Sequence, residues 1–217
     1  PMDINNYLLD LKSKKYAYKT VLTKLQIIRQ VCDYAIINGW LKTNPASVIK
    51  IPKGLSKTKR EAASEADIIK IKNSQGNTFY LFAFVALYTG CRRGEILALQ
   101  YEDFDFKNKT ISITKSVYHE PNAPYIKKPK TQAGNRAIPL LEPLEAAVKP
   151  LKIKGYLFTN EQGNLLSNQQ AVTLWEHYCK ETDITITPHQ LRHAYATRLY
   201  ELNIDENDLT DIINKVN

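Results

Sequence analysis

Cysteine, long apolar runs and targeting signals are all scarce in this sequence of 217 residues. Its three cysteines, Cys32, Cys91 and Cys179, form an odd, scattered set without metal-ligand spacing. That pattern argues against a disulfide scaffold or a metal site and favours reduced thiols in the cytoplasm. The longest apolar run, residues 79–88, is too short to cross a bilayer, and no signal peptide is recognisable. We therefore expect a cytoplasmic protein without a membrane partner.

Acidic residues are also scarce in the first 60 positions, which hold 12 Lys and Arg against 3 Asp and Glu. The other positions hold 18 against 19, so nearly all of the net charge of +8 comes from the N-terminal segment. A basic segment on a near-neutral body is typical of proteins that bind an anionic polymer. The alternative is a solvated, lysine-rich surface with no partner. The apolar share of 43% is sufficient for a sizeable core.

The N-terminal third has helical apolar periodicity over residues 3–12 and 16–38. The pair Asn38-Gly39 is typical of a left-handed cap that ends the second helix. Asn44-Pro45 predicts the start of a short helix, with Asn44 as N-cap and Pro45 as the first helical residue. Residues 51–60 are basic, contain proline and glycine, and predict an interdomain linker, with a surface loop as the alternative.

The rest of the chain predicts a mainly α-helical fold with a small antiparallel β-sheet. Ser64 and Asp67 have the spacing of a capping box, which predicts a helix to about Lys72. Period-two alternation predicts strands at 110–114 and 136–139, with a long irregular hairpin region around three prolines between them. The other predicted elements are helices at 78–88, 95–99, 141–149, 168–180, 189–202 and 206–214 and a short strand at 156–158.

Arg92 is the first candidate for binding a phosphate. It follows Gly90, which is expected to end the buried helix, and the pattern reads Thr-Gly-x-Arg-x-x-Glu. A guanidinium is a planar, permanently charged fork that matches two phosphate oxygens, and Glu95, three residues later, can brace it. An ordinary Arg–Glu pair on a helix surface is the alternative.

His189 and Arg192 are the second candidates. They lie three residues apart on the helix that follows Pro188, so they share a face. An imidazole beside a guanidinium is unfavourable unless an anion lies between them, and a helix N-terminus adds positive potential. His193 is expected to point away from that face. The arrangement predicts a phosphate site.

Lys130 is the third candidate, in the region between the two predicted strands. A lysine there can protonate a leaving 5′-oxygen if neighbouring cations lower its pKa. Lys127 and Lys128 compete for the same role. A basic hairpin that contacts DNA nonspecifically is the alternative.

Three strings together resemble the catalytic domain of the tyrosine recombinases, the family of phage and transposon integrases. They are Thr89–Glu95, Lys130–Pro139 and His189–Thr197. The resemblance covers residues 62–217, and residues 3–50 are similar to the later part of the family's core-binding domain, especially Ala35–Pro45. It implies a partial helical core-binding domain at 1–50, a basic linker at 51–63 and an α+β catalytic domain at 64–217.

The resemblance also implies the chemistry. Arg92 and Arg192 would clamp the scissile phosphate, His189 would assist proton transfer, and Lys130 would protonate the leaving 5′-hydroxyl, with Glu95 and His193 in support. The activity would be site-specific recombination of a phage or transposon through a 3′-phosphotyrosyl intermediate. No metal or ATP cofactor is expected, because the phosphotyrosyl bond conserves the energy of the broken strand.

The sequence departs from the family pattern in two ways. Lys215 stands where the family usually has His or Trp; it could donate to a phosphate oxygen or be an ordinary helix-end lysine. The family's tyrosine lies beyond that position, after the last residue given. Tyr195 and Tyr200 are expected to pack rather than attack. We therefore expect the 217 residues alone to bind duplex DNA without breaking it.

Double-stranded DNA is the expected partner, with a monomer off DNA and, in the intact recombinase, a tetramer on paired sites. A noncatalytic DNA-binding protein derived from an integrase and a type IB topoisomerase are the alternatives. Basic residues outside the candidate active site are expected to contact the duplex: Lys19, Lys24, Arg29, Lys53, Lys57, Lys59, Arg60, Lys127 and Lys128.

Overall fold

The computed structural model describes residues 1–57, 62–127 and 135–201, which fall into two compact units, Pro1–Arg60 and Glu61–Asn217. The helix predicted at 206–214 lies outside the described residues. So do five of the candidate basic residues: Lys59, Arg60, Lys128, Lys130 and Lys215. Within the described ranges, no helix combines the length and the apolar character that a membrane span requires.

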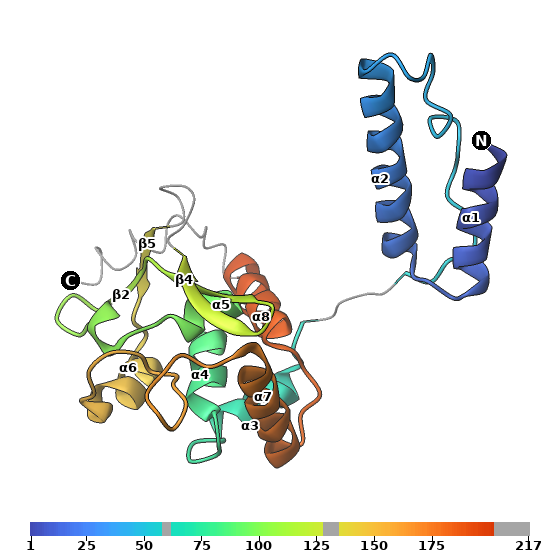
Figure 1. Cartoon of the computed structure of the whole chain (residues 1–217). Helices are drawn as coiled ribbons and strands as arrows, with labels where there is room; N and C mark the ends of the chain where they lie inside the picture. The colour runs from blue at the N-terminus through green and yellow to red at the C-terminus, as the bar shows by residue number, and fades with distance from the viewer. Residues whose placement is uncertain (58–61, 128–134, 202–217) are drawn as a thin grey trace. The chain divides into compact units, whose positions relative to one another are not determined.

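Two helices, α1 (Met2–Ser13) and α2 (Tyr18–Ile37), form the first unit, as the periodicity predicts. Asn38 is the C-cap residue of α2, and Gly39 follows it with φ of +73°, which confirms the predicted cap. The chain then returns between the two helices (Figure 1). A small apolar core holds the three segments together: Leu8, Leu11, Val21, Leu25, Ala46 and Ile49.

Two expectations for the returning segment are corrected. The short helix at Asn44-Pro45 is wrong; the chain makes a turn, in which the side-chain Oδ1 of Asn44 accepts from the backbone N–H of Ala46 at 2.8 Å. That bond is one an N-cap would make, but the carbonyl oxygens of Ala46 and Ile49 accept from Arg29 on α2, so a tertiary contact fixes the segment as a turn. Ile51 and Leu55 of the expected linker pack against the small core, so residues 51–55 are part of the first unit.

The second unit combines helices with two small antiparallel sheets. Strands β1 (Phe104–Asp105), β2 (Thr110–Ile113) and β5 (Arg136–Pro139) pair in the order β1-β2-β5, and β3 (Ser116–Glu120) pairs with β4 (Ala123–Lys127). The helices are α3 (Glu65–Lys72), α4 (Tyr80–Thr89), α5 (Arg93–Leu97), α6 (Glu142–Val148), α7 (Asn168–Thr182) and α8 (Pro188–Glu201). Short 3₁₀ turns occupy Tyr101–Asp103 and Lys149–Leu151.

Helix α4 lies in the middle of this unit and contacts α3, α5, α6 and α8 (Figure 1). It is apolar on every face, which is typical of a fully buried helix, and the prediction of a buried helix here is confirmed. Its core residues include Phe82, Val85 and Ala86. The capping box predicted at Ser64 and Asp67 is also present at the start of α3.

Two predictions about the strands are wrong. The region with three prolines is not irregular over residues 116–127, where β3 and β4 form a regular hairpin in which Pro124 pairs with His119. Pro129, the third proline, lies outside the described residues. Among the described residues β4 pairs with one strand only, so a missing N–H on its other edge costs no ladder bond. The strand predicted at 156–158 is reduced to isolated bridges, Gln100 with Tyr156 and Thr159 with Leu165.

Candidate functional site

The candidate site is built on the turn that joins α4 to α5. Gly90 ends α4 in the left-handed conformation, with φ of +58°. The hydroxyl of Thr89 donates to the carbonyl oxygen of Val85 at 2.6 Å and accepts from the N–H of Cys91 at 3.1 Å. Arg92 is then the N-cap residue of α5, which begins two residues earlier than predicted. The backbone that carries Arg92 is therefore fixed on both sides.

Gly90 also lets α8 approach this turn. A Cβ atom at position 90 would lie 2.3 Å from Cδ1 of Tyr195, far inside van der Waals contact. The ring of Tyr195 thus packs over the turn, as expected for this tyrosine. Glycine is required here both by the backbone conformation and by the neighbouring ring.

Replacing Gly90 with alanine is expected to lower the free energy of unfolding by about 2–4 kcal/mol, from left-handed strain together with overpacking. Chemical denaturation measures the loss. Gly163 is the matched control, because it has φ of +78° but no atom within 4 Å of a built Cβ. The Gly163→Ala variant should lose only the backbone part, about 1–2 kcal/mol. Equal losses at the two positions would contradict the close contact with Tyr195.

Glu95 braces Arg92 through two hydrogen bonds. The backbone N–H of Arg92 donates to Oε2 of Glu95 at 2.9 Å, and Nη1 of Arg92 donates to Oε1 at 3.0 Å. The carboxylate side chain is only 10% exposed, whereas the Arg92 side chain is 68% exposed. One edge of the guanidinium is thus held while most of the side chain stays accessible to an anion.

Arg136, at the start of β5, binds the same carboxylate from the other side. Its Nη2 lies 2.8 Å from Oε2 of Glu95, and its Nη1 lies 3.4 Å from Oε1. Nη2 also donates to Sγ of Cys91 at 3.6 Å. In the sequence, Arg136 stands out only as part of the string Lys130–Pro139, and no role in the site was predicted for it. An arginine opening an otherwise apolar strand was the available signal.

The charges around Glu95 are reflected in two pKa shifts. Burial alone would raise the pKa of Glu95, but hydrogen bonds from Arg136 and Arg92 outweigh it and leave that pKa below its ordinary value. Burial raises the pKa of the Cys91 thiol, and the nearby charges of Arg136 and Arg192 offset only part of that increase. The carboxylate is therefore ionised at neutral pH and the thiol is neutral.

Helix α8 brings Arg192 to the same turn, where its Nη1 donates to the carbonyl oxygen of Gly90. Arg92, Arg136 and Arg192 thus all contact the segment from Gly90 to Glu95. We call these three arginines and Glu95 the arginine cluster.

The histidines of α8 correct one expectation. The ring of His193 does not point away from His189: their centroids are 4.4 Å apart in an edge-on arrangement. Residues four apart on a helix lie one above the other, so the two rings share a face. His189 is exposed in the first turn of α8, three residues before Arg192. Among the described residues, no group of three or more His, Cys, Asp or Glu is arranged to hold a metal ion.

Lys127, a competitor of Lys130, lies at the end of β4 with its Nζ over two tyrosine rings, 4.9 Å from the centroid of Tyr118 and 4.8 Å from that of Tyr125. The hydrogen bond with Tyr125 is the main reason that the pKa of Lys127 is raised. A general acid for the leaving oxygen needs the opposite shift. The described part of the hairpin therefore gives no support to Lys127 as the acid.

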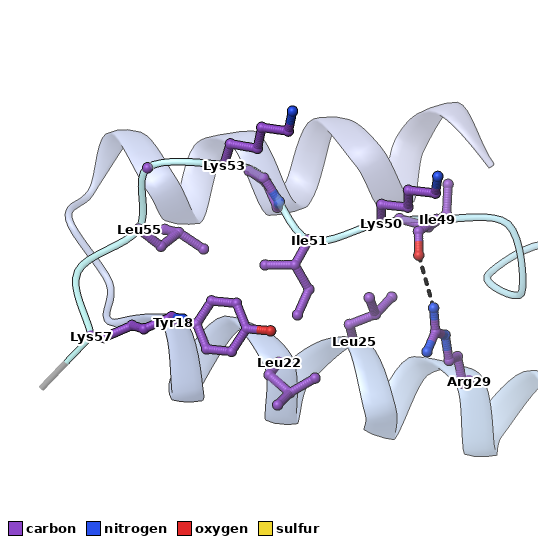
Figure 2. Close-up of a pocket in the computed structure, with 12 residues that line it drawn as sticks. Tyr18, Leu22, Leu25, Arg29, Ile49, Lys50, Ile51, Lys53, Leu55 and Lys57 are labelled. Atoms are coloured by element: carbon purple, nitrogen blue, oxygen red, sulfur yellow. Dashed lines mark hydrogen bonds between the residues drawn. The ribbon is translucent and has the colours of Figure 1, made fainter. Parts of the chain in front are cut away.

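The basic residues of the first unit are placed in different ways. Arg29, Lys53 and Lys57 border an open groove of about 510 Å³ between α2 and the returning segment (Figure 2). Arg29 has a structural task, because its Nε donates to the carbonyl oxygen of Ala46 at 3.1 Å and its Nη2 to that of Ile49 at 2.8 Å. Lys53 and Lys57 are exposed, and so is Lys19 on α2, whereas Lys24 is half-buried.

Comparison with known proteins identifies the class. The profile of the phage integrase family matches residues 58–216. This chain belongs to that family, and the membership predicted from the three strings is confirmed.

The chain is similar to a tyrosine recombinase XerC-like protein of Caldanaerobacter subterraneus subsp. tengcongensis, with 25% identity over 250 residues that cover 100% of the chain and 64% of the relative. It is also 25% identical over 250 residues to the transposase from transposon Tn916 of Enterococcus faecalis, covering 100% of the chain and 60% of that protein. The chain thus spans less than two thirds of the length of these relatives.

A solved structure with a similar fold is the Tn1549 transposon integrase (residues 82–397, Y379F) in complex with transposon right end DNA. It superimposes with a TM-score of 0.81 at 22% identity, covering 100% of this chain and 77% of the integrase chain. The predicted fold class, mainly helical with a small antiparallel sheet, is confirmed.

Proposed function

We propose that this chain is the DNA-binding and phosphate-binding part of a site-specific recombinase that integrates a mobile element. The observation that carries the proposal is the arginine cluster, in which guanidinium groups from α8, β5 and the turn before α5 gather on six residues. Membership of the phage integrase family and the similarity to a transposon transposase support the same reading.

Charge gives the proposed site its preference for a phosphodiester. The arginine cluster combines three guanidinium groups with one ionised carboxylate, so two positive charges remain for an anion. Negative charge grows on the nonbridging oxygens as the phosphate is attacked, and preorganised cations stabilise that transition state more than the ground state. In the proposal, Arg92 and Arg192 each bind one nonbridging oxygen, and Arg136 stays with Glu95.

The proposed reaction exchanges one phosphoester for another. A tyrosine oxygen forms a bond to phosphorus, the bond to the 5′-oxygen breaks, and Lys130 supplies the proton that the leaving oxygen takes up. His189 assists proton transfer near the attacking oxygen, with the N-terminus of α8 adding positive potential. Lys215 is proposed as a further donor to the phosphate.

The two units are proposed to share the work. The first unit, with 12 Lys and Arg against 3 Asp and Glu over residues 1–60, would act as a helical DNA-binding module. The second would position the scissile phosphate. Double-stranded DNA is the proposed partner, bound by a monomer that assembles into tetramers on paired sites in the intact recombinase.

A polypeptide of these 217 residues alone is expected to bind a nicked suicide duplex without forming a covalent adduct. Tyr195 packs on the turn at Gly90. Tyr200 was expected to pack but is 83% exposed near the end of α8, and we propose that neither tyrosine is the attacking group. Electrophoresis under native and denaturing conditions separates the two outcomes, and the full-length Tn916 transposase on its own nicked site serves as the positive control. A denaturant-resistant complex mapped to a tyrosine of this chain would overturn this expectation.

The same experiment tests the proposed function. A shifted native complex supports a DNA-binding recombinase part. Failure to bind any duplex would reject it.

A further inference from the structure

The contacts of Arg136 have a consequence for the charge at Arg92. We propose that Arg136 is a positioning residue that neutralises Glu95, so that Arg92 keeps its positive charge for a phosphate while remaining braced. This inference rests on the proposed phosphate-binding role of Arg92 and assigns a separate task to a residue of a different strand.

Both carboxylate oxygens of Glu95 already accept hydrogen bonds. Its two oxygens accept from the backbone and side chain of Arg92 and from both terminal nitrogens of Arg136. The carboxylate is almost fully buried, where an unneutralised charge is costly and interacts strongly with its neighbours. Glu95 can therefore hold Arg92 without cancelling its charge only if a second cation neutralises the carboxylate.

The net charge around Arg92 depends on Arg136. Arg92 and Glu95 alone form a neutral pair, which would attract a phosphate weakly. With Arg136 added, the trio carries one net positive charge. The exposures separate the roles, since the side chain of Arg92 is 68% exposed and that of Arg136 is 30% exposed. Arg92 is available to a ligand, and Arg136 is turned toward the carboxylate and the buried Cys91.

Four variants test this idea by charge compensation. Arg136→Gln leaves Glu95 to cancel Arg92, so we expect duplex affinity to fall about tenfold and the slope of log K against log salt to fall by about one. Arg136→Lys retains the charge and should keep most of the affinity. The double variant Glu95→Gln/Arg136→Gln removes both charges, and its affinity and salt slope should recover. The single variant Glu95→Gln completes the double-mutant cycle and should lose less affinity for duplex DNA than Arg136→Gln.

Arg93→Gln is the matched control for structure. Arg93 is also half-buried, and its guanidinium binds Asn168 through Nη1 at 2.9 Å without touching Glu95. Its replacement should lower thermal stability without changing the salt slope. If Arg136 had only a structural task, the double variant would bind no better than Arg136→Gln, and this result would overturn the inference.

A second readout does not depend on duplex binding. In the wild-type chain, inorganic phosphate should shift the side-chain Nε–H resonance of Arg92; the shift should be lost in Arg136→Gln and regained in the double variant. A wild-type chain that binds no duplex would reject the proposed function, while the phosphate titration would still decide the role of Arg136. Equal responses of Arg92 in wild type and in Arg136→Gln would overturn the inference alone.

Discussion

Replacing Arg192 with alanine is expected to slow DNA strand cleavage by about 10²–10³-fold in a form of the recombinase that carries its nucleophile. Its guanidinium lies at the carbonyl of Gly90, beside the turn that carries Arg92, where negative charge would develop on the phosphate. Duplex affinity should fall much less, because many other phosphates share the binding energy. Single-turnover rates on a nicked suicide duplex measure the effect separately from affinity.

Arg198 provides the control on the same helix. Its side chain is 65% exposed, with Nη1 at 4.0 Å from Oε2 of Glu65, and it is placed outside the arginine cluster. Exposed ion pairs contribute little, so Arg198→Ala should change the cleavage rate by less than about twofold. Arg92→Lys adds a second comparison: it keeps the charge but loses the planar fork, and it should still slow cleavage strongly. A wild-type rate of strand cleavage in the Arg192→Ala variant would refute the proposed role of Arg92 and Arg192 as a phosphate clamp.

Binding of the chain to duplex DNA is expected to weaken by about three to five decades between roughly 50 and 200 mM salt, if about six to ten phosphates are neutralised. In the proposal, the basic first unit and the arginine cluster would supply the cations for these contacts. Fluorescence anisotropy with a short duplex measures the slope. Lys19→Ala, on the exposed surface of α2, should reduce the slope by about one.

Lys14 and Arg29 provide two control positions for the salt titration. The ammonium of Lys14 lies 2.8 Å from Oδ2 of Asp10, so the pair is neutral and Lys14→Ala should leave the slope unchanged. Arg29 was expected to contact DNA, but its donors hold the backbone carbonyls of Ala46 and Ile49; Arg29→Ala should therefore reduce stability more than it changes the slope. A flat salt titration of the wild-type chain would contradict binding through many phosphate contacts.

Local patterns in the sequence were sufficient for the elements whose causes are local. Helix α4 was predictable because ten consecutive residues are almost all apolar, and the start of α3 because Ser64 and Asp67 have the spacing of a capping box. The brace between Arg92 and Glu95 was predictable for the same reason, since residues three apart on a helix are neighbours.

Features that depend on distant segments were not predictable. Arg136 reaches Glu95 across 41 positions, and its place depends on the pairing of β5 with β2, in which Arg136 lies opposite Ile113. The regular hairpin of β3 and β4 was missed because proline in a strand argues against pairing unless one edge needs no partner. The turn after Asn44 likewise depends on a distant residue, because Arg29 of α2 donates to the carbonyl oxygens of Ala46 and Ile49.

A structure of the chain bound to a nicked duplex is the most direct measurement. We predict that Arg92 and Arg192 bind the nonbridging oxygens of one phosphodiester, with Arg136 still on Glu95. A duplex bound on another surface, with no phosphate at the turn between α4 and α5, would contradict it.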